Sequence, residues 1–321
     1  MPAMEPIVIA TNMFGIKMLR LAALAAVAVV LQAARADAAP LRVAFPSGMN
    51  GQIVVTMDKA GIAKRHGLDA TFTEFQYGPP MMEALAAGSI DAIVTSLMPV
   101  TAYAAKLPGD VKIVAMLGHS SYSLMVAKDS ADKAPADLAG QTIGVSFGSD
   151  SHLDTMVWLK DQGLADKVHL VNIAPGDMAT SLAEKSVDAI VIRQPQVLRL
   201  QEQTGARVLQ TWPFRFLSMV KSGFAAEQPD ALEKYLSSLR ESLLYIAQNH
   251  QQAASWFGAD LRIDPNIVMA VSKEDPNYDA KTLADIDISV TPAARDMMAK
   301  WADDAYASKM IKSKVDIGKL F

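Results

Sequence analysis

Four short segments combine hydroxyl, amide and glycine residues, each after an apolar run, and an arginine follows a fifth run. Backbone N–H groups, hydroxyls and a guanidinium can hold an anionic or oxygen-rich small molecule through hydrogen bonds alone. Each of these residues could instead only cap a helix or close a turn. The candidate ligand-binding residues are Ser47, Gly48, Met49, Asn50, Ser96, Leu97, His119, Ser120, Gly148, Ser149, Asp150, Ser151 and Arg193.

The segment from Gly148 to Ser151 is the strongest candidate, because it lies between a predicted strand and a predicted helix. The free N–H groups and the dipole of a helix N-terminus favour an anion or a polar oxygen. Asp150 complicates this prediction, since an unpaired carboxylate would repel an anion. We expect Asp150 to cap the following helix, whereas Ser149 and Ser151 face the ligand.

Arg193 follows a buried strand and could hold a carboxylate or a sulfonate through two parallel hydrogen bonds. An ion pair across a hinge is the structural alternative for Arg193, and a hydrogen-bonded structural role is the alternative for His119. Met49, Met98 and Phe147 lie in or beside predicted loops and could form an apolar wall. Together these residues favour a ligand with an anionic end and a carbon body.

Other chemistries find less support in the sequence. The chain has no cysteine, which excludes disulfides, thiolate catalysis and cysteine-bound zinc. Its five histidines have no metal-ligand spacing, so we expect neither a metal nor a cofactor. The motif G-x-S-x-G at Gly144–Gly148 raises a secreted serine hydrolase as the alternative from another class, with Ser146, Asp188 and His250 as its triad. Ser146 lies inside a predicted strand, so we expect no catalysis and no enzyme.

Length, charge and the N-terminus restrict the class of protein. A chain of 321 residues with net charge −4 lacks the basic surplus of nucleic-acid-binding proteins. The apolar run Leu21–Leu31 is too short to span a membrane. It follows Lys17 and Arg20 and precedes small-residue cleavage patterns that end at Ala38. Residues 1–38 are therefore predicted to be a signal peptide, and the mature protein to be periplasmic.

The segments Leu85–Val94 and Leu182–Val191 match at seven of ten positions, and each has an Asp before a short β-branched run. A helix that feeds a buried parallel strand has this pattern. Two copies predict two α/β lobes on one plan, with the two strands in separate sheets and a ligand cleft between the lobes.

Apolar and β-branched runs that alternate with amphipathic stretches predict right-handed βαβ units and a mostly parallel sheet in each lobe. Ligands then bind beyond the carboxyl ends of the strands, where the candidate residues lie. From Pro229 onward the pattern is mostly helical. Residues 118–121 are expected to form a turn between two strands, and hinges are expected near residues 120 and 212. Strands are predicted at 41–45, 71–75, 91–95, 111–117, 123–127, 142–147, 168–173 and 207–211, with helices at 81–87 and 152–162.

Several of these segments resemble a known family, the periplasmic solute-binding proteins of ABC importers of the nitrate/sulfonate/taurine type. The resembling segments include D-L-A-G-Q-T-I-G-V at Asp137–Val145, G-S-D-S-H-L at Gly148–Leu153, D-Q-G-L at Asp161–Leu164 and the entry to the last long helix at Ala226–Pro229. The resemblance implies a type II periplasmic binding protein fold, in which two lobes are joined by two hinge crossings. We expect lobe one to comprise residues 39–120 and 213–321, and lobe two residues 121–212.

The expected function is capture of a small organic anion, a sulfonate or a carboxylate, in the cleft between the lobes. The resemblance implies delivery to an ABC permease in the inner membrane, and the sequence does not separate this role from delivery to a sensory receptor. A neutral heterocycle such as a pyrimidine is the alternative ligand. We expect a monomer that binds no nucleic acid.

Overall fold

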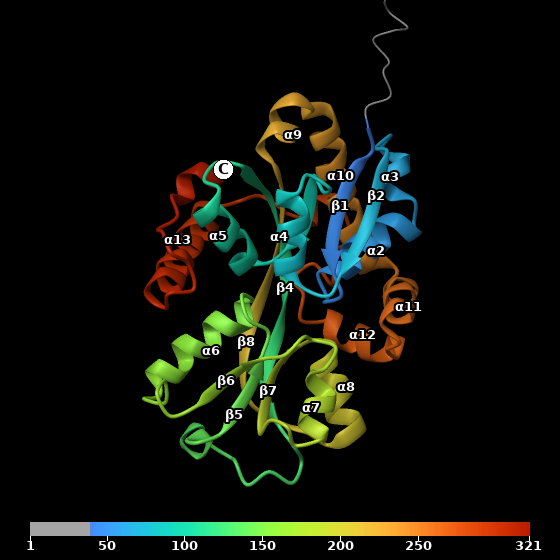
Figure 1. Cartoon of the computed structure of the whole chain (residues 1–321). Coiled ribbons are helices and arrows are strands. Elements are labelled where there is room, and N and C mark those ends of the chain that lie inside the picture. The colour runs from blue at the N-terminus through green and yellow to red at the C-terminus, as the bar shows by residue number, and fades with distance from the viewer. Residues whose placement is uncertain (1–38) are drawn as a thin grey trace, which may run out of the picture. The chain divides into compact units, whose positions relative to one another are not determined.

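An eight-stranded sheet runs through residues 39–321, the part of the chain that the computed structural model describes (Figure 1). The strands lie in the order β2-β1-β3-β8-β4-β7-β5-β6. The predicted signal peptide lies outside the described residues. The strands are β1 (Leu41–Pro46), β2 (Ala70–Phe75), β3 (Ala92–Thr95), β4 (Val111–Val126), β5 (Thr142–Val145), β6 (His169–Asn172), β7 (Ala189–Arg193) and β8 (Arg207–Lys221).

Helices connect these strands and make up most of the chain after β8. The first group is α2 (Gly51–Lys59), α3 (Ile62–Arg65), α4 (Gly78–Ala86), α5 (Leu97–Lys106), α6 (Asp150–Asp161), α7 (Met178–Ala183) and α8 (Gln196–Thr204). The second group is α9 (Ser222–Glu227), α10 (Pro229–Gln248), α11 (His250–Leu261), α12 (Pro265–Ser272) and α13 (Pro292–Ala307). Short 3₁₀ turns are η1 (Pro135–Leu138), η2 (Leu283–Asp285) and η3 (Ile317–Leu320).

Parallel pairing occurs at both ends of the sheet. β1 pairs with β2 and β3, and β5 pairs with β6 and β7, all in parallel. We call the end with β2, β1 and β3 lobe one, and the end with β7, β5 and β6 lobe two. The predicted α/β fold of two lobes, each with a mostly parallel sheet flanked by helices, is confirmed.

Side chains on neighbouring strand positions of lobe one enter two different cores, as the period of two of a strand requires. Val43 and Phe45 pack in the core that contains residues of α2, α3 and α10. Ala44, between them, packs in the core that contains residues of α4, α5 and α13. Helices therefore cover both faces of lobe one. Within residues 39–321, no helix has the length and apolarity needed to cross a membrane.

The two central strands, β4 and β8, connect the lobes. They pair antiparallel over their whole lengths, from Val111 opposite Lys221 to Val126 opposite Arg207, and Figure 1 shows them running from the upper part of the ribbon to the lower. The predicted turn at 118–121 and the predicted strand end at 211 are therefore wrong. The pairing shifts register at three places, so β-bulges absorb the irregular sequence while the ladder continues.

The two repeat copies form β3 and β7, and both strands belong to this one hydrogen-bonded sheet. The prediction of separate sheets is wrong, because β4 and β8 join the lobes edge to edge. The lobe boundaries at 120/121 and 212/213 stay a prediction. By their contacts, Leu41–Phe321 form one compact unit.

The Asp of each repeat copy makes the same contact. The carboxylate of Asp91 accepts from the backbone N–H of Arg42 at 3.1 Å, and that of Asp188 accepts from the N–H of Thr142 at 2.7 Å. Each backbone N–H of the two aspartates donates in return to the carbonyl of the same partner. The repeated Asp therefore fixes the register between a strand and its parallel neighbour, a structural role that explains its recurrence.

Candidate functional site

A cavity lies between the lobes, at the carboxyl ends of the parallel strands. We call it the interlobe cavity. Lobe one contributes residues that follow β2 and β3. Lobe two contributes residues that follow β5 and β6 and the last three residues of β7, and the central strands supply two aromatic rings. Its lining is Tyr77, Gly78, Ser96, Pro99, Tyr122, Ser146, Ser149, Asp150, Ser151, Pro175, Met178, Val191, Ile192, Arg193 and Phe214.

Asp150 joins the lobes across this cavity. It belongs to the first turn of α6, in lobe two, and is 3% exposed. Its carboxylate accepts hydrogen bonds from Ser96 Oγ at 2.9 Å, from Leu97 N at 3.2 Å and from Met98 N at 2.8 Å. These three donors form the N-terminus of α5, in lobe one. Burial nevertheless raises the pKa of Asp150 to about 7, and the hydrogen bonds from Met98 and Ser96 offset only part of that shift.

The predicted capping role of Asp150 is thus wrong in one respect, because Asp150 caps α5 of the opposite lobe. The residue that caps α6 is Ser149, whose Oγ accepts from His152 N at 3.3 Å. Ser149 Oγ also lies 2.8 Å from Ser151 Oγ. In the described part of the chain, the backbone N–H groups of Asp150 and Ser151 have no protein acceptor. The α6 N-terminus therefore retains donors for an anion.

Arg193, at the end of β7, also reaches across the cavity. Its Nη2 donates to Ser47 Oγ at 3.1 Å and to the carbonyl of Gln76, both in lobe one. Burial lowers the pKa of Arg193 to about 10, and the nearby carboxylate of Glu74 offsets part of this shift. Gly48 packs so closely on the guanidinium that a Cβ there would lie 2.7 Å from Nε. The contact is a hydrogen-bonded tether between the lobes rather than an ion pair.

An aromatic cluster forms the apolar floor of the cavity. Tyr122, in β4, stacks on Trp212 with ring centroids 5.7 Å apart and meets Phe214 edge to face at 5.8 Å. Its hydroxyl donates to Asp154, one turn beyond Asp150 on α6, and burial raises the pKa of Asp154 to about 6. The cavity therefore combines an apolar floor, a guanidinium and a helix N-terminus with the buried carboxyl of Asp150.

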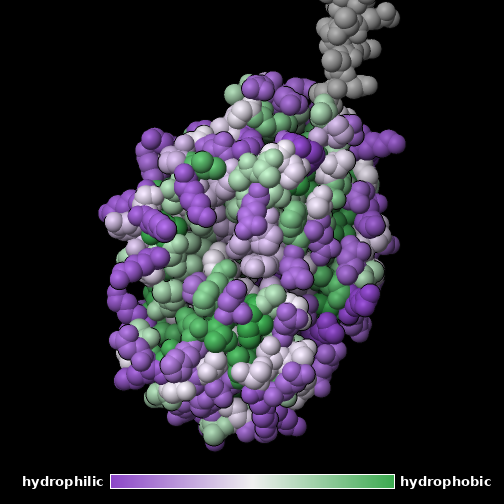
Figure 2. Space-filling model, viewed as in Figure 1, coloured by the Kyte–Doolittle hydropathy of each residue, from purple (hydrophilic) through white to green (hydrophobic). Residues whose placement is uncertain are grey.

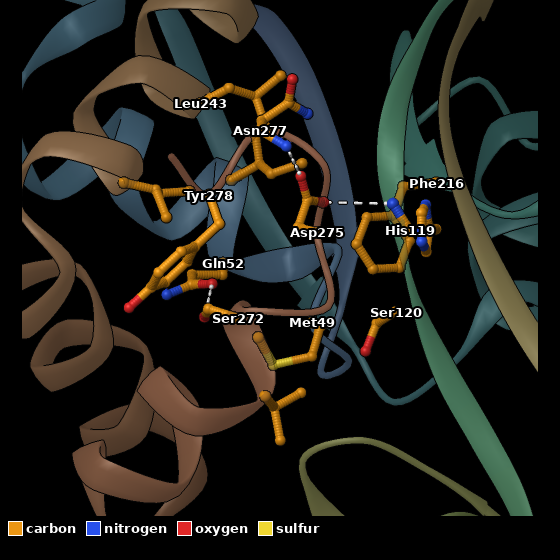
Figure 3. Close-up of a pocket in the computed structure, with 13 residues that line it drawn as sticks. Met49, Gln52, His119, Ser120, Phe216, Leu243, Ser272, Asp275, Asn277 and Tyr278 are labelled. Carbon is orange, nitrogen blue, oxygen red and sulfur yellow. Dashed lines mark hydrogen bonds between the residues drawn. The ribbon is translucent and has the colours of Figure 1, made fainter. Parts of the chain in front are cut away.

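A second cavity is lined by three further predicted residues, Met49, His119 and Ser120. We call it the hinge cavity. Figure 3 shows it between β4 and the chain that follows α12. There the carboxylate of Asp275 accepts from His119 N at 3.2 Å and from Asn277 N at 2.8 Å, and burial raises its pKa to about 6. The two cavities share no lining residue.

The other predicted residues lie outside both cavities. Ser47 and Gly48 contact Arg193, Leu97 donates to Asp150, and Gly148 lies between Pro79 and the first turn of α6. Asn50 is 0% exposed, and within residues 39–321 its side-chain amide has no hydrogen-bond partner.

The predicted apolar wall is only partly at the cavities. Met98 is buried in a core with Leu153 rather than in either cavity. Phe147 is 39% exposed and stacks on His152 at 4.3 Å. Of the three residues expected to form that wall, Met49 alone lines one of the two cavities.

Sequence reasoning missed several lining residues. Tyr77 and Pro175 come soon after β2 and β6, so the strand-end rule that selected Ser96 could have selected them as well. Tyr122 and Phe214 carried no such signal, because they lie within long strands that the sequence divided into shorter pieces.

The structure does not assemble the serine triad that the G-x-S-x-G motif raised. Ser146 Oγ donates to the carbonyl of Ile173 at 2.9 Å, and the carboxylate of Asp188 accepts from the backbone N–H of Thr142. The ring of His250 stacks on Tyr278 at 3.9 Å. Among residues 39–321 there is also no cluster of three or more acidic or histidine side chains suited to a metal ion.

Two α/β lobes are joined by two long central strands, and a cavity lies where the strand ends of the two lobes meet. This arrangement defines the periplasmic binding protein fold. A profile of the family described as "NMT1/THI5 like" matches residues 52–253. This chain belongs to the NMT1/THI5-like family.

Known proteins of similar sequence and structure agree with this class. The "Putative aliphatic sulfonates-binding protein" of Escherichia coli K12 is 24% identical over 308 residues, 93% of each chain. The alkanesulfonate-binding protein SsuA from Xanthomonas axonopodis pv. citri, bound to MOPS, superposes with a TM-score of 0.77 at 19% identity, over 89% of this chain and 98% of that one. The periplasmic aliphatic sulphonate binding protein SsuA from Escherichia coli superposes at 0.73 with 22% identity, over 89% and 92%.

Proposed function

We propose that the chain is the extracytoplasmic solute-binding component of an ABC importer and captures a small organic anion, a sulfonate or a carboxylate, in the interlobe cavity. The observation that carries this proposal is the combination of the Arg193 guanidinium with the free N–H groups of the α6 N-terminus on one cavity. Both groups favour negative charge, and the ring of Tyr122 beside them suits a carbon body. The names of the similar proteins point to the same ligand class.

Ligand screening by thermal shift tests the ligand class, because a molecule that binds only the folded state raises its melting temperature. We expect sulfonates or carboxylates to stabilise the protein, and nitrate and pyrimidines to have smaller effects. Arg193→Ala should weaken the best anion about 10- to 100-fold in calorimetric titration, the loss of one charge-assisted hydrogen bond. Arg199→Ala is the matched control, since Arg199 lies on α8, outside the lining of the interlobe cavity, and its Nε donates to Gln203. Unchanged anion affinity in Arg193→Ala would contradict the proposal.

A neutral heterocycle is the second candidate, and the carboxylate of Asp150 favours it. A buried carboxylate on the cavity can accept hydrogen bonds from ring N–H or amino groups, but it repels an anion. Stabilisation by pyrimidines alone in the same screen would select this candidate.

Delivery to a permease and export to the periplasm are part of the same proposal. We expect the exported protein to begin at residue 39, which N-terminal sequencing of the mature chain would show. We also expect deletion of the gene to abolish uptake of the labelled ligand by intact cells. Uptake that survives the deletion would favour delivery to a sensory receptor.

A further inference from the structure

The strand pairing extends the internal repeat to the segments that precede each copy. Val43 of β1 and Ile143 of β5 lie opposite the same alanine of the two repeat copies, so these two residues are equivalent. Counting forward from them along both segments makes Asn50 the counterpart of Asp150, and each follows a glycine by two positions. The two lobes thus contain the same strand–turn–helix unit, with an amide in one and a carboxyl in the other.

This comparison shows that the unit does not need a carboxyl at this position. Asn50 immediately precedes α2 and makes no capping hydrogen bond, and its amide has no partner within residues 39–321. In the other lobe, Ser149 caps α6, so Asp150 is not needed there either. The carboxyl of Asp150 therefore has a role outside the local fold of its own lobe.

That role is a contact with the opposite lobe. The carboxylate of Asp150 accepts three hydrogen bonds, all from the N-terminus of α5, the helix next to α6 in Figure 1. Oδ1 accepts from Ser96 Oγ and Met98 N, and Oδ2 accepts from Leu97 N. The two N–H groups lie in the first turn of α5, where a helix supplies them with no acceptor. Separation of the lobes would break all three bonds together.

An apolar contact lies beside these hydrogen bonds. Leu153, three positions after Asp150 on α6, packs in a small core with Met98 of α5, Ala305 of α13 and Ile311. Figure 2 shows hydrophobic residues gathered toward the middle of the face seen in Figure 1, whereas most of the periphery is hydrophilic. Apolar packing is non-directional, whereas hydrogen bonds require a defined geometry. The bonds of Asp150 therefore fix how α6 sits against α5.

Other hydrogen bonds connect the lobes elsewhere along the cavity. Arg193 donates to Ser47 and to the carbonyl of Gln76, and the neighbouring Gln194 donates to Glu274 Oε1 at 3.2 Å. These contacts do not involve α5 or α6. They would survive the loss of the Asp150 carboxyl, which makes the contribution of the α5–α6 contact separately measurable.

We propose that Asp150 is an interlobe latch, whose carboxylate on the N-terminus of α5 keeps the lobes together and must leave that helix before the interlobe cavity opens. Water replaces each broken hydrogen bond, so the net contribution of each bond is small and the latch is reversible. Capture of a ligand from solution then depends on how often the latch opens. Only this consequence rests on the proposed function, because the opening itself needs no ligand.

Opening can be measured with a single thiol, because the chain has no cysteine. Ser146 lines the interlobe cavity and is 6% exposed, so Ser146→Cys places a thiol that a reagent reaches after opening. With dilute reagent, the lobes reclose faster than labelling occurs, and the labelling rate is proportional to the open fraction. In this background, Asp150→Ala should raise the rate about 10- to 100-fold, and Ser96→Ala, which removes one donor, about fivefold.

Two controls show whether the effect belongs to the contact. Asp161→Ala replaces the same residue type at the exposed end of α6 and should leave the rate unchanged. The double variant with Asp150→Ala and Ser96→Ala should label no faster than Asp150→Ala alone, because the two side chains form one hydrogen bond. Circular dichroism and melting temperature confirm that each variant is folded.

A distance measurement shows whether the lobes separate. Spin labels on Lys106→Cys, in α5, and Lys160→Cys, in α6, occupy exposed positions on the two latched helices. The natural protein should give one dominant distance between the labels, and Asp150→Ala should add a longer one.

Several outcomes would overturn the latch. Labelling of Ser146→Cys as fast as that of a free thiol would show that the lobes are not held together. Equal labelling rates in Asp150→Ala and Asp161→Ala would assign closure to the apolar contact and to Arg193. Faster labelling without a longer distance between the spin labels would confine the change to α6. Failure of every sulfonate and carboxylate in the thermal-shift screen would reject the proposed function and leave the latch intact.

Discussion

Asp150 and Arg193 carry opposite charges, and each reaches from lobe two to a polar group of lobe one. Arg193 donates to Ser47 and to a carbonyl, and Asp150 accepts from the first turn of α5. The carboxylate thus occupies a helix N-terminus that would otherwise be free for an anion. A ligand that uses α5 must first displace Asp150, whereas one that uses α6 need not.

Asp150→Asn should change how stability depends on pH. The carboxyl of Asp150 has an ordinary pKa of 3.8, which burial raises to about 7 in the fold. Between these values the folded state holds a proton that the unfolded chain has lost, so stability falls as pH rises through this window. Asparagine does not titrate, so the melting temperature of Asp150→Asn relative to the natural protein should increase from pH 5 to pH 8.

Other titrating groups are the same in both proteins, although the charge of Asp154 contributes to the raised pKa of Asp150. Asp154 and Asp275 have pKa values raised to about 6, and His152 has one lowered to about 4, but all three are present in both proteins. Asp161→Asn, at the exposed end of α6, is the control. If the difference in melting temperature between Asp150→Asn and the natural protein stays constant with pH, the raised pKa of Asp150 is refuted.

At the scale of the element, the two repeat copies end their helices in the same left-handed conformation. The first copy has Gly88 with φ of 72°, and the second has Lys185 with φ of 57° at the equivalent position. A left-handed conformation costs a residue with a Cβ roughly 1–2 kcal/mol, and glycine adopts it without this cost. The second copy therefore carries a strain that the first avoids.

Lys185→Gly should accordingly stabilise the protein by about 0.5–1 kcal/mol. Gly88→Ala should destabilise it by about 1 kcal/mol. A Cβ on Gly88 would meet no atom within 4 Å, so the cost comes from the backbone conformation alone. Denaturant unfolding measures both changes. Lys185→Ala is the control, since it removes the exposed ion pair with Asp129 but keeps the strain. Equal stabilities of Lys185→Gly and Lys185→Ala would contradict this account.

For the whole molecule, β4 and β8 decide how the lobes unfold. Their ladder passes through both lobes without a break, and residues Leu41–Phe321 form one compact unit. Neither lobe can lose its sheet without breaking strands that the other lobe shares.

We therefore expect thermal unfolding to be a single cooperative transition. Differential scanning calorimetry tests this, and the calorimetric and van't Hoff enthalpies should agree. A saturating ligand should shift the whole transition to higher temperature. Two resolved transitions, of which the ligand shifts only one, would show that the lobes unfold independently.

The sequence by itself determined the local features of this protein. Local patterns predicted the alternation of strands and helices, the repeat with an Asp before each strand, and the long helix after Pro229. The contact by which that Asp fixes the register is seen only in the structure. The rule that ligands bind beyond strand ends brought Ser149, Ser151 and Arg193 to one cavity, because the ends of parallel strands meet at one edge.

Only the tertiary structure decided the rest. The residues 118–121 read locally as a turn, but cross-strand pairing with β8 extends them, and pairing between distant segments leaves no mark in a local pattern. The helix that Asp150 caps, and the division of the predicted site between two cavities, likewise depend on how the lobes close. Contacts between lobes are set by packing across the whole chain, so no single segment encodes them.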